Sequence, residues 1–277
     1  MNASSNTTSD LKLDENAVNT TDEVKAYWEK RSCGTDKSQR DRYSLEYFEE
    51  IEEFRYKYEP FIHSFAQFTR WSGKRVLEVG VGAGTDFLQF VRAGAAASGV
   101  DLTQEAIRNV QKRLALYDLK AEDLRNCNAE TLPYEPGAFD LVYSWGVIHH
   151  AENMERVFSE IYRVARVGAH VKIMVYNRRS LHAWYMFLRY GLPRVMLLGG
   201  RNWAIYHFQE SYSTKVYTER EIRSLLRHFP HMDLRFHYWD QLIRDGARFE
   251  SIRRVLQRVS PPACRWYLAF EFVKAET

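Results

Sequence analysis

The stretch VLEVGVGAGTDF, from Val76 to Phe87, sets the tightest limit on the fold of this chain. A short apolar run ends at Gly80, three closely spaced glycines follow, and a helix-like stretch comes after them. The run is short enough for a buried strand, and the glycines permit a tight turn in which the backbone comes close to a ligand. A strand, a glycine turn and a helix in this order are typical of a parallel sheet that is covered by helices.

The same alternation of strand and helix continues as far as Tyr176. Apolar runs predict strands at 73–80, 95–102, 139–145 and 170–176 and a weaker one within 121–130, with helices at 85–94, 103–119 and 154–166. We expect Gly94 to end the first of these helices and Thr103 to cap the second. Helices at 218–229 and 248–259 and strands at 233–239 and 265–274 complete the pattern. The chain is therefore predicted to be α/β, built from βαβ units with right-handed crossovers.

Outside this core the sequence predicts further regions within one domain. Residues 1–20 are polar and are expected to be a disordered tail, while 21–277 form a single domain. Within it, 21–70 form a helical lid, 71–177 the binding core, 178–217 an aromatic and basic cap inserted after the fifth strand, and 218–277 the end of the sheet.

Composition and charge exclude several classes of protein. Three widely spaced cysteines exclude a disulfide framework or a CxxC metal site, and they favour the cytoplasm. The polar N-terminus does not resemble a signal peptide, and no apolar run approaches the roughly 20 residues of a membrane span, so no membrane partner is expected. Acidic residues predominate in 1–70 and basic ones in 177–277. The basic excess is either a solvated surface or a site for an acidic substrate or a nucleic acid.

The glycine turn favours a ligand other than a dinucleotide. The dinucleotide pattern GxGxxG would need glycine at position 85, where Thr85 stands, and this disfavours a nicotinamide oxidoreductase. Asp101 follows 21 residues after Gly80, at the end of the second predicted strand. A carboxylate there either accepts hydrogen bonds from ribose hydroxyls or caps a helix.

The chain resembles the class I S-adenosylmethionine-dependent methyltransferases, in their small-molecule, type 11-like branch. The resemblance covers roughly residues 72–177 and is carried by VLEVGVGAGTDF, VDLT, NAETLPY, FDLVYSWGVIHH and EIYRVARVGAHVKIMVY. Two positions depart from the family: Asn128 stands where Asp is usual, and Val167–Ala169 replaces a Pro-Gly-Gly turn.

This resemblance implies a Rossmann-like, doubly wound sheet of seven mostly parallel strands with an antiparallel last strand. It implies S-adenosylmethionine as cofactor, S-adenosylhomocysteine as product, and no metal. The glycines lie against the methionine and ribose, Asp101 holds the ribose diol, Asn128 and Ala129 read the adenine edge, and Trp145 borders the amino-acid end. The cofactor-binding set is then Tyr27, Trp28, Glu78, Gly80, Gly82, Gly84, Thr85, Asp101, Leu102, Asn128, Ala129 and Trp145.

The acceptor side is less constrained by the sequence. Methyl transfer from a sulfonium is an in-line displacement that needs a base only if the acceptor holds its proton. His149 and His150 are candidates for that base, or they only shape the loop. Thr218 and Glu221 form a predicted capping box. The residues expected to face the substrate are Arg178, Glu210, Lys215 and Tyr217.

Three functions remain open from the sequence. The first is methylation of O, N or C in a small metabolite, in specialised metabolism. The second is methylation of RNA or protein through the basic C-terminal third, although no Asn-Pro-Pro-Tyr or Asp-Pro-Pro-Tyr tetrapeptide follows the fourth predicted strand. The third is a non-catalytic binding protein that kept the fold. The sequence predicts neither the acceptor nor an oligomeric state.

Overall fold

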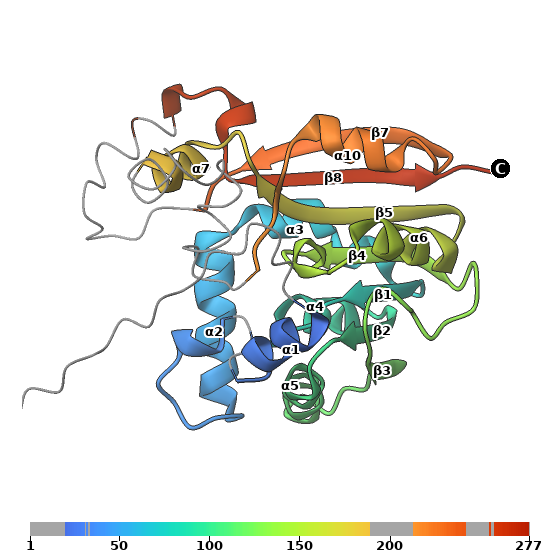
Figure 1. The fold of residues 1–277 in the computed structure, drawn as a ribbon. Helices are drawn as coiled ribbons and strands as arrows, with labels where there is room; N and C mark the ends of the chain where they lie inside the picture. Colours follow the sequence, from blue (N-terminus) through green and yellow to red (C-terminus); the bar gives the residue numbers. More distant parts are fainter. Residues whose placement is uncertain are drawn as a thin grey trace, which may run out of the picture.

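A single mixed sheet organises the molecule (Figure 1). The computed structural model describes residues 20–30, 32, 34–188, 213–241, 255 and 258–276. Its strand order is β3-β2-β1-β4-β5-β8-β7, with β6 paired to β5; β8 runs antiparallel to β5 and β7, and the other pairs are parallel. The strands are β1 Arg75–Val79, β2 Ala96–Asp101, β3 Asp123–Asn126, β4 Phe139–Trp145, β5 Ala165–Asn177, β6 Val216–Tyr217, β7 His231–Trp239 and β8 Tyr267–Lys274. The predicted mostly parallel sheet with an antiparallel last strand is confirmed, with the two-residue β6 in addition.

Helices cover both faces of the sheet and extend over its edge. One face packs against α3, α4 and α5, and the other against α6 and α10, each through a continuous apolar cluster. The α-helices are α1 Thr21–Lys30, α2 Leu45–Tyr58, α3 Phe61–Ala66, α4 Thr85–Arg92, α5 Gln104–Ala115, α6 Met154–Val164, α7 Leu181–Met186 and α10 Glu219–Leu226, and the 3-10 helices are η1 Thr35–Lys37, η2 Phe68–Trp71, η3 Ile148–His150 and η5 Pro262–Cys264. None of the helices in these described ranges is both long and apolar enough to span a bilayer.

Helix ends follow the signals in the sequence. The Thr103 hydroxyl accepts a hydrogen bond from the backbone N–H of Ala106 and caps α5, as predicted. Thr218 and Glu221 form the predicted capping box at the start of α10. Gly94 follows α4 with a φ of 84°, a left-handed conformation that favours glycine and ends the helix. These local signals are confirmed because each depends on residues within one turn of the helix.

Two regions differ from the sequence-based boundaries or lie outside the description. The turn predicted at Val167–Ala169 does not separate α6 from β5; it is a bulge inside the long strand β5. Phe139 pairs with Ala165 and Leu141 with His170, so the intervening residues loop out, with Gly168 at φ 78°. Most of the predicted helix 248–259, all but 255, 258 and 259, and most of the cap 178–217 lie outside the described residues.

The strand order reverses direction between β1 and β4. From β1 the chain steps outward to β2 and β3, then returns to β4 on the other side of β1. In open α/β sheets this is the point at which ligands bind, beyond the carboxyl ends of the strands. The turn after β1 lies at this point.

Candidate functional site

The turn from Gly80 to Gly84 is a backbone cradle with open space at its centre. A Cβ on Gly80 would lie 2.3 Å from a Val147 methyl, and Gly80 has a φ of 86°, so only glycine fits. Gly82 has a φ of 52° and no heavy atom within 4 Å of the place a Cβ would take. Gly84, with φ 72°, packs its Cα against Val110 of α5 and begins α4. The turn is thus closed behind Gly80 and Gly84 and open at Gly82.

Asp101 joins the turn to the end of β2. Its Oδ2 accepts a hydrogen bond from the N–H of Gly82 at 3.1 Å, and its Oδ1 accepts from the N–H and the hydroxyl of Thr103 at 2.9 and 2.8 Å. Burial raises the pKa of this carboxyl, although the hydrogen bonds from Thr103 and Gly82 oppose the rise. Asp101 therefore fixes the position of the glycine turn while keeping part of its surface exposed.

Glu78, just before the turn, carries a buried oxygen without a partner. The side chain is 4% exposed, and Oε2 makes no hydrogen bond within the described part of the chain. Burial, and then the neighbouring charge of Asp86, raise its pKa well above the usual range, while Arg55 opposes this. An orphaned buried carboxylate is costly. A cationic group placed at the turn would satisfy it.

Asp86, in the first turn of α4, is the opposite case. Arg55 donates to it from Nε at 2.9 Å and from Nη2 at 2.5 Å, and the hydroxyls of Tyr56 and Tyr143 each donate at 3.0 Å. The pKa of Asp86 is lowered because Arg55 outweighs the effect of burial. Arg55 also lies 3.8 Å from Glu59, so its partners are the carboxylates of Asp86 and Glu59. This network ties α2 to the core beneath the turn.

Arg113, a residue that the sequence did not single out, holds the turn from the other side. Its Nη1 donates to the carbonyl of Ala83 at 3.2 Å and to the hydroxyl of Thr85 at 2.9 Å, and Nη2 pairs with Glu52 of α2. The Arg113 side chain is fully buried. It looks in the sequence like one of several charged residues of α5, and its role follows only from the packing of α5 against the turn.

Helix α1 crosses the carboxyl edge of the sheet and is held at both ends. At its start Thr21 donates to Glu152 from its N–H at 3.3 Å and from its hydroxyl at 3.1 Å. At its end the carboxylate of Glu29 accepts from the N–H groups of Gln104 and Glu105, at 3.0 Å each. Glu29 thereby supplies the charge that the N-terminus of α5 favours. It is a further residue that the sequence did not single out.

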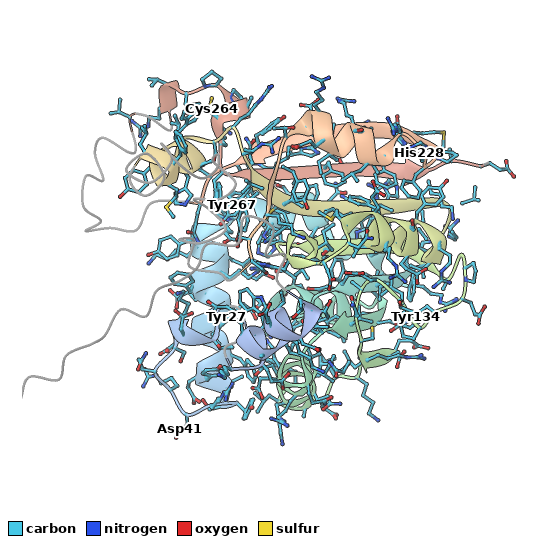
Figure 2. The ribbon with its side chains drawn as sticks, viewed as in Figure 1. Tyr27, Asp41, Tyr134, His228, Cys264 and Tyr267 are labelled. Atoms are coloured by element: carbon cyan, nitrogen blue, oxygen red, sulfur yellow. The ribbon has the colours of Figure 1, made fainter. Side chains whose placement is uncertain are left out.

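The two aromatic residues predicted in α1 lie on this bridging helix. Tyr27 and Trp28 pack edge to face at 5.0 Å, and the Trp28 ring lies 5.3 Å from that of His150 (Figure 2 labels Tyr27). The structure therefore brings the lid helix onto the loop after β4. Whether these rings also contact a cofactor stays a prediction.

The end of β3 and the following turn supply the third side. Asn126 donates to the carbonyl of Asp101 at 3.0 Å, and the side-chain oxygen of Asn128 accepts from the N–H of Glu130 at 2.9 Å. Asn128 thus stabilises its own turn. Leu102, which follows β2, and Ala129, which follows Asn128, are both half-buried. Ala129 packs against the apolar cluster under α6.

Trp145 ends β4 with its side chain directed into the aromatic layer. Its indole N–H donates to Glu59 at 3.2 Å, and its ring lies 5.9 Å from Phe61 and 6.1 Å from Tyr267, which Figure 2 labels. Tyr267 also donates to Glu59, at 3.0 Å. The side chain is therefore part of the core, while the side chain of Val147, two residues further along, lies against Gly80 in the turn.

The histidine pair lies in η3, at the end of β4. His149 is fully buried, and neither ring nitrogen has a hydrogen-bond partner among the described residues. Its ring contacts those of His150 at 4.1 Å and Tyr176 at 4.7 Å. Burial, then the charges of His150 and Lys215, lower the pKa of His149 well below the usual value, so it is neutral at neutral pH. His150 lies 3.2 Å from the Ser213 hydroxyl.

The predicted substrate residues fall into different surroundings. Lys215 donates from Nζ to the backbone carbonyls of Ala151 at 2.6 Å and Glu152 at 3.3 Å, so it braces the loop after η3. Arg178 pairs with Glu221 of α10. Tyr217 is half-buried in β6, and burial raises its pKa. Glu210 lies outside the described residues. A substrate contact for any of them stays a prediction.

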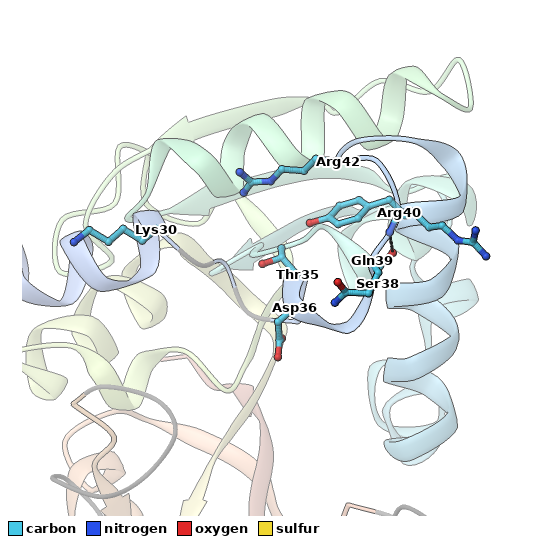
Figure 3. A pocket seen from close by; sticks show the side chains of 8 residues that line it. Lys30, Thr35, Asp36, Ser38, Gln39, Arg40 and Arg42 are labelled. Carbon is cyan, nitrogen blue, oxygen red and sulfur yellow. Dashed lines mark hydrogen bonds between the residues drawn. The ribbon is translucent and has the colours of Figure 1, made fainter. Parts of the chain in front are cut away.

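The loop between α1 and α2 forms an open pocket of about 420 Å³ (Figure 3). Its two arginines are paired with carboxylates, because Arg40 pairs with Glu50 and Arg42 with Glu105, both at 2.7 Å. The pocket lining is Lys30, Thr35, Asp36, Ser38, Gln39, Arg40, Arg42 and Tyr47. We assign this pocket to the anchoring of the loop, because its arginines are taken up by carboxylates of α2 and α5.

Comparison with known proteins finds a family model that matches the central part of the chain. Residues 77–173 match the family described as methyltransferase domain. Phthiotriol/phenolphthiotriol dimycocerosates methyltransferase 1 of Mycobacterium ulcerans is 34% identical over 111 residues, 39% of this chain and 40% of the relative. Norajmaline N-methyltransferase of Rauvolfia serpentina is 31% identical over 112 residues, 39% and 38% of the two chains. The chain spans about two fifths of the length of these curated relatives.

Solved structures share the fold over more of the chain. Geranyl diphosphate C-methyltransferase from Streptomyces coelicolor has a TM-score of 0.60 at 14% identity, covering 94% of this chain and 100% of that one. Phosphoethanolamine N-methyltransferase 2 of Haemonchus contortus has a TM-score of 0.55 at 20% identity, covering 87% and 60%. At these identities the likeness is one of fold.

Proposed function

We propose that the chain is a class I S-adenosylmethionine-dependent methyltransferase that transfers a methyl group from this cofactor to a small-molecule acceptor. The names of the relatives, which describe methylation of lipids and an alkaloid, support a metabolite as acceptor. We further propose O, N or C methylation in specialised metabolism, in the cytoplasm, where a chain with few cysteines stays reduced.

One observation carries the proposal: an open cradle at the switch point of the sheet, next to a buried carboxyl group whose Oε2 has no partner among the described residues. The buried Oε2 of Glu78 lacks a partner, and the space over Gly82 is open. S-adenosylmethionine carries an ammonium and a sulfonium and no phosphate. The residues present therefore fit it, since burial raises the pKa of the Glu78 carboxyl and a bound cation would stabilise its charged form, whereas a pyrophosphate would need N–H donors.

The chain's own residues divide the work between holding the donor and closing the site. When bound, the cofactor supplies an activated methyl group, whose bond to sulfur breaks as the bond to the acceptor forms. In our proposal Asp101 accepts from the ribose hydroxyls while keeping its bond to Gly82. Glu78 faces the positive end, and α1 excludes water, clamped at Thr21 and Glu29.

On the acceptor side His149 is the group we propose to meet the nucleophile. It is neutral at neutral pH, since its pKa is lowered by burial, and both of its nitrogens lack partners within the described chain. It can therefore accept the acceptor's proton or hold the acceptor by a hydrogen bond. The contact of His150 with Trp28 places the second histidine under the lid helix instead.

Titration calorimetry with S-adenosylmethionine tests the proposal through two matched glycines. Gly82 and Gly73 both have positive φ, 52° and 69°, and at both a Cβ would meet no heavy atom within 4 Å. Gly82→Ala and Gly73→Ala should therefore cost similar stability, about 1–2 kcal/mol. Only Gly82→Ala should weaken cofactor binding, by at least about tenfold, because the methyl group would occupy the cradle. Absence of binding to the folded wild type, or equal affinities of both variants, would refute the proposal.

A further inference from the structure

Helix α7 exposes an apolar stripe to solvent. The stripe has the spacing i, i+3, i+4, i+7, which places its members on one side of a helix. Opposite to it, Ala183 and Met186 are buried in the core. The stripe consists of Leu181, Trp184 and Tyr185 of α7 and of Leu188, two residues beyond its end, which are 39%, 44%, 53% and 54% exposed. The side of α7 that lies opposite its buried residues is therefore also apolar, and it is largely exposed.

The stripe lies beside the acceptor end of the site. Helix α7 follows β5, and the Asn177 side chain donates to the carbonyls of Ala263 and Arg265 at 2.8 Å each. From α7 itself His182 contacts Trp266 at 4.5 Å, and Trp266 stacks on Tyr176 at 4.5 Å. Figure 1 shows α7 at the end of β5 and β8, beside the segment that leads into β8. A chain of rings thus leads from α7 to Tyr176, which contacts His149.

Further exposed apolar and basic side chains belong to the residues just before α7 and to the segment that leads into β8. Val255 and Val259 are 57% and 72% exposed and precede η5, whose Cys264 is labelled in Figure 2. Arg179, just before α7, and Arg258 are exposed. The sequence from 161 to 209 contains no Asp or Glu, although it contains several arginines. Exposed aliphatic, aromatic and basic side chains are therefore combined here without acidic residues in the α7 region of the sequence.

We propose that the exposed stripe of α7 docks this protein on an anionic lipid surface. Tryptophan and tyrosine favour the boundary between headgroups and acyl chains, leucine favours the acyl chains, and arginine is attracted by anionic headgroups. A nucleic acid would match the arginines but would leave the leucines in water. The expectation of no membrane partner came from the absence of a long apolar run, which excludes a span and does not bear on a helix lying at the surface.

Vesicle co-sedimentation of the full chain tests this proposal without any acceptor or cofactor. We expect binding to vesicles of phosphatidylglycerol and phosphatidylcholine, weaker binding to phosphatidylcholine alone, and loss of the difference at high salt. The double variant Trp184→Ser, Tyr185→Ser should lower the partition coefficient by about tenfold. Both side chains are about half exposed, so the fold and the calorimetric binding of S-adenosylmethionine should persist.

The matched control is Leu116→Ser, since Leu116 is 43% exposed at the C-cap of α5. It should sediment with anionic vesicles like the wild type. No binding to anionic vesicles, or equal binding by the double variant and the wild type, would overturn the proposal. It would also be overturned by light scattering that shows a dimer lost in the double variant without vesicles, which would make the stripe an interface between copies. Cofactor binding is measured separately, so failure here leaves the proposed methyl transfer intact.

Discussion

The two sides of the site, along β1 and β2 and along β4 and β5, each contain a buried ionisable side chain with an atom that lacks a hydrogen-bond partner among the described residues, and we compare Glu78 on the first side with His149 on the second. On the β1 side it is the Glu78 carboxylate, whose pKa is raised well above its usual range by burial. On the β4 side it is the His149 imidazole, whose pKa is lowered well below its usual value by burial. A cation would stabilise the charged form of Glu78, and a neutral group that forms a hydrogen bond would satisfy a ring nitrogen of His149.

The surroundings of the two groups differ as well. Around Glu78 the other polar side chains are fixed by partners from distant elements, as Asp86 is by Arg55 and the turn is by Arg113. Around His149 the contacts are mainly rings, those of His150 and Tyr176. A rigid polar frame suits one invariant ligand, and an aromatic wall admits acceptors of various shapes. Under the proposed function, the difference predicts that the donor is recognised by electrostatics and the acceptor by shape.

The largest effect is expected when the buried polar network around Asp86 is disrupted. Asp86→Ala would leave Arg55 buried without its bidentate partner and remove the acceptor of the Tyr143 hydroxyl. The free energy of unfolding in urea should fall by about 3–5 kcal/mol. Asp123→Ala removes the partner of Arg125 at the surface and should change it little. Similar losses in both variants would show that the network does not stabilise the donor side.

The next effect concerns the proposed hydrogen bonds between Asp101 and the ribose hydroxyls of the cofactor. Asp101→Asn keeps the size of the side chain but loses a charged acceptor, so binding of S-adenosylmethionine should weaken by about 1.5–3 kcal/mol, or ten- to hundredfold. Calorimetry measures the affinity. The control is Asp140→Asn, because Asp140 is also an aspartate of the sheet but pairs with Arg166. An unchanged affinity for Asp101→Asn would limit this residue to holding Gly82 and Thr103.

A smaller effect is expected on the pH dependence of S-adenosylmethionine binding. The free protein holds Glu78 with a raised pKa, and a bound cation would lower it, so binding releases a proton below that raised pKa. The association constant for S-adenosylmethionine should therefore rise with pH, by up to about tenfold per pH unit below the pKa of Glu78. Calorimetry between about pH 5 and 8 measures the slope. Glu78→Gln should flatten it, and an unchanged slope in that variant would transfer the effect to another carboxyl such as Asp101.

The donor side could be predicted from the sequence to a much greater extent than the acceptor side. The strand before Gly80, the end of α4 at Gly94 and the caps at Thr103 and Thr218 are written in short stretches of sequence, and all appear in the structure. Their patterns depend on neighbours within a few residues. The bulge at Gly168 was missed as part of a strand because it depends on how β5 pairs with β4.

Residues that act across the fold could not be found in this way. Glu29 reaches the N-terminus of α5 and Arg113 reaches Ala83, and both look in the sequence like ordinary charges of amphipathic helices. Lys215 was expected to face the substrate, which stays a prediction, and its bonds to backbone carbonyls after η3 could not be read from the sequence. Only the tertiary arrangement decides such roles, since a flexible side chain has several partners within reach.

The smallest effect tests the acceptor side and has the opposite sign. His149→Phe replaces a buried imidazole without hydrogen bonds by an apolar ring that fits beside Tyr176. Removing an unsatisfied polar group while keeping the packing should raise the free energy of unfolding, by about 1 kcal/mol. His150→Phe loses the contact with the Ser213 hydroxyl and should not be stabilised. Urea unfolding without ligand measures both. A loss of stability in His149→Phe would mean that the imidazole serves the fold, and it would remove the reason to place the acceptor's proton there.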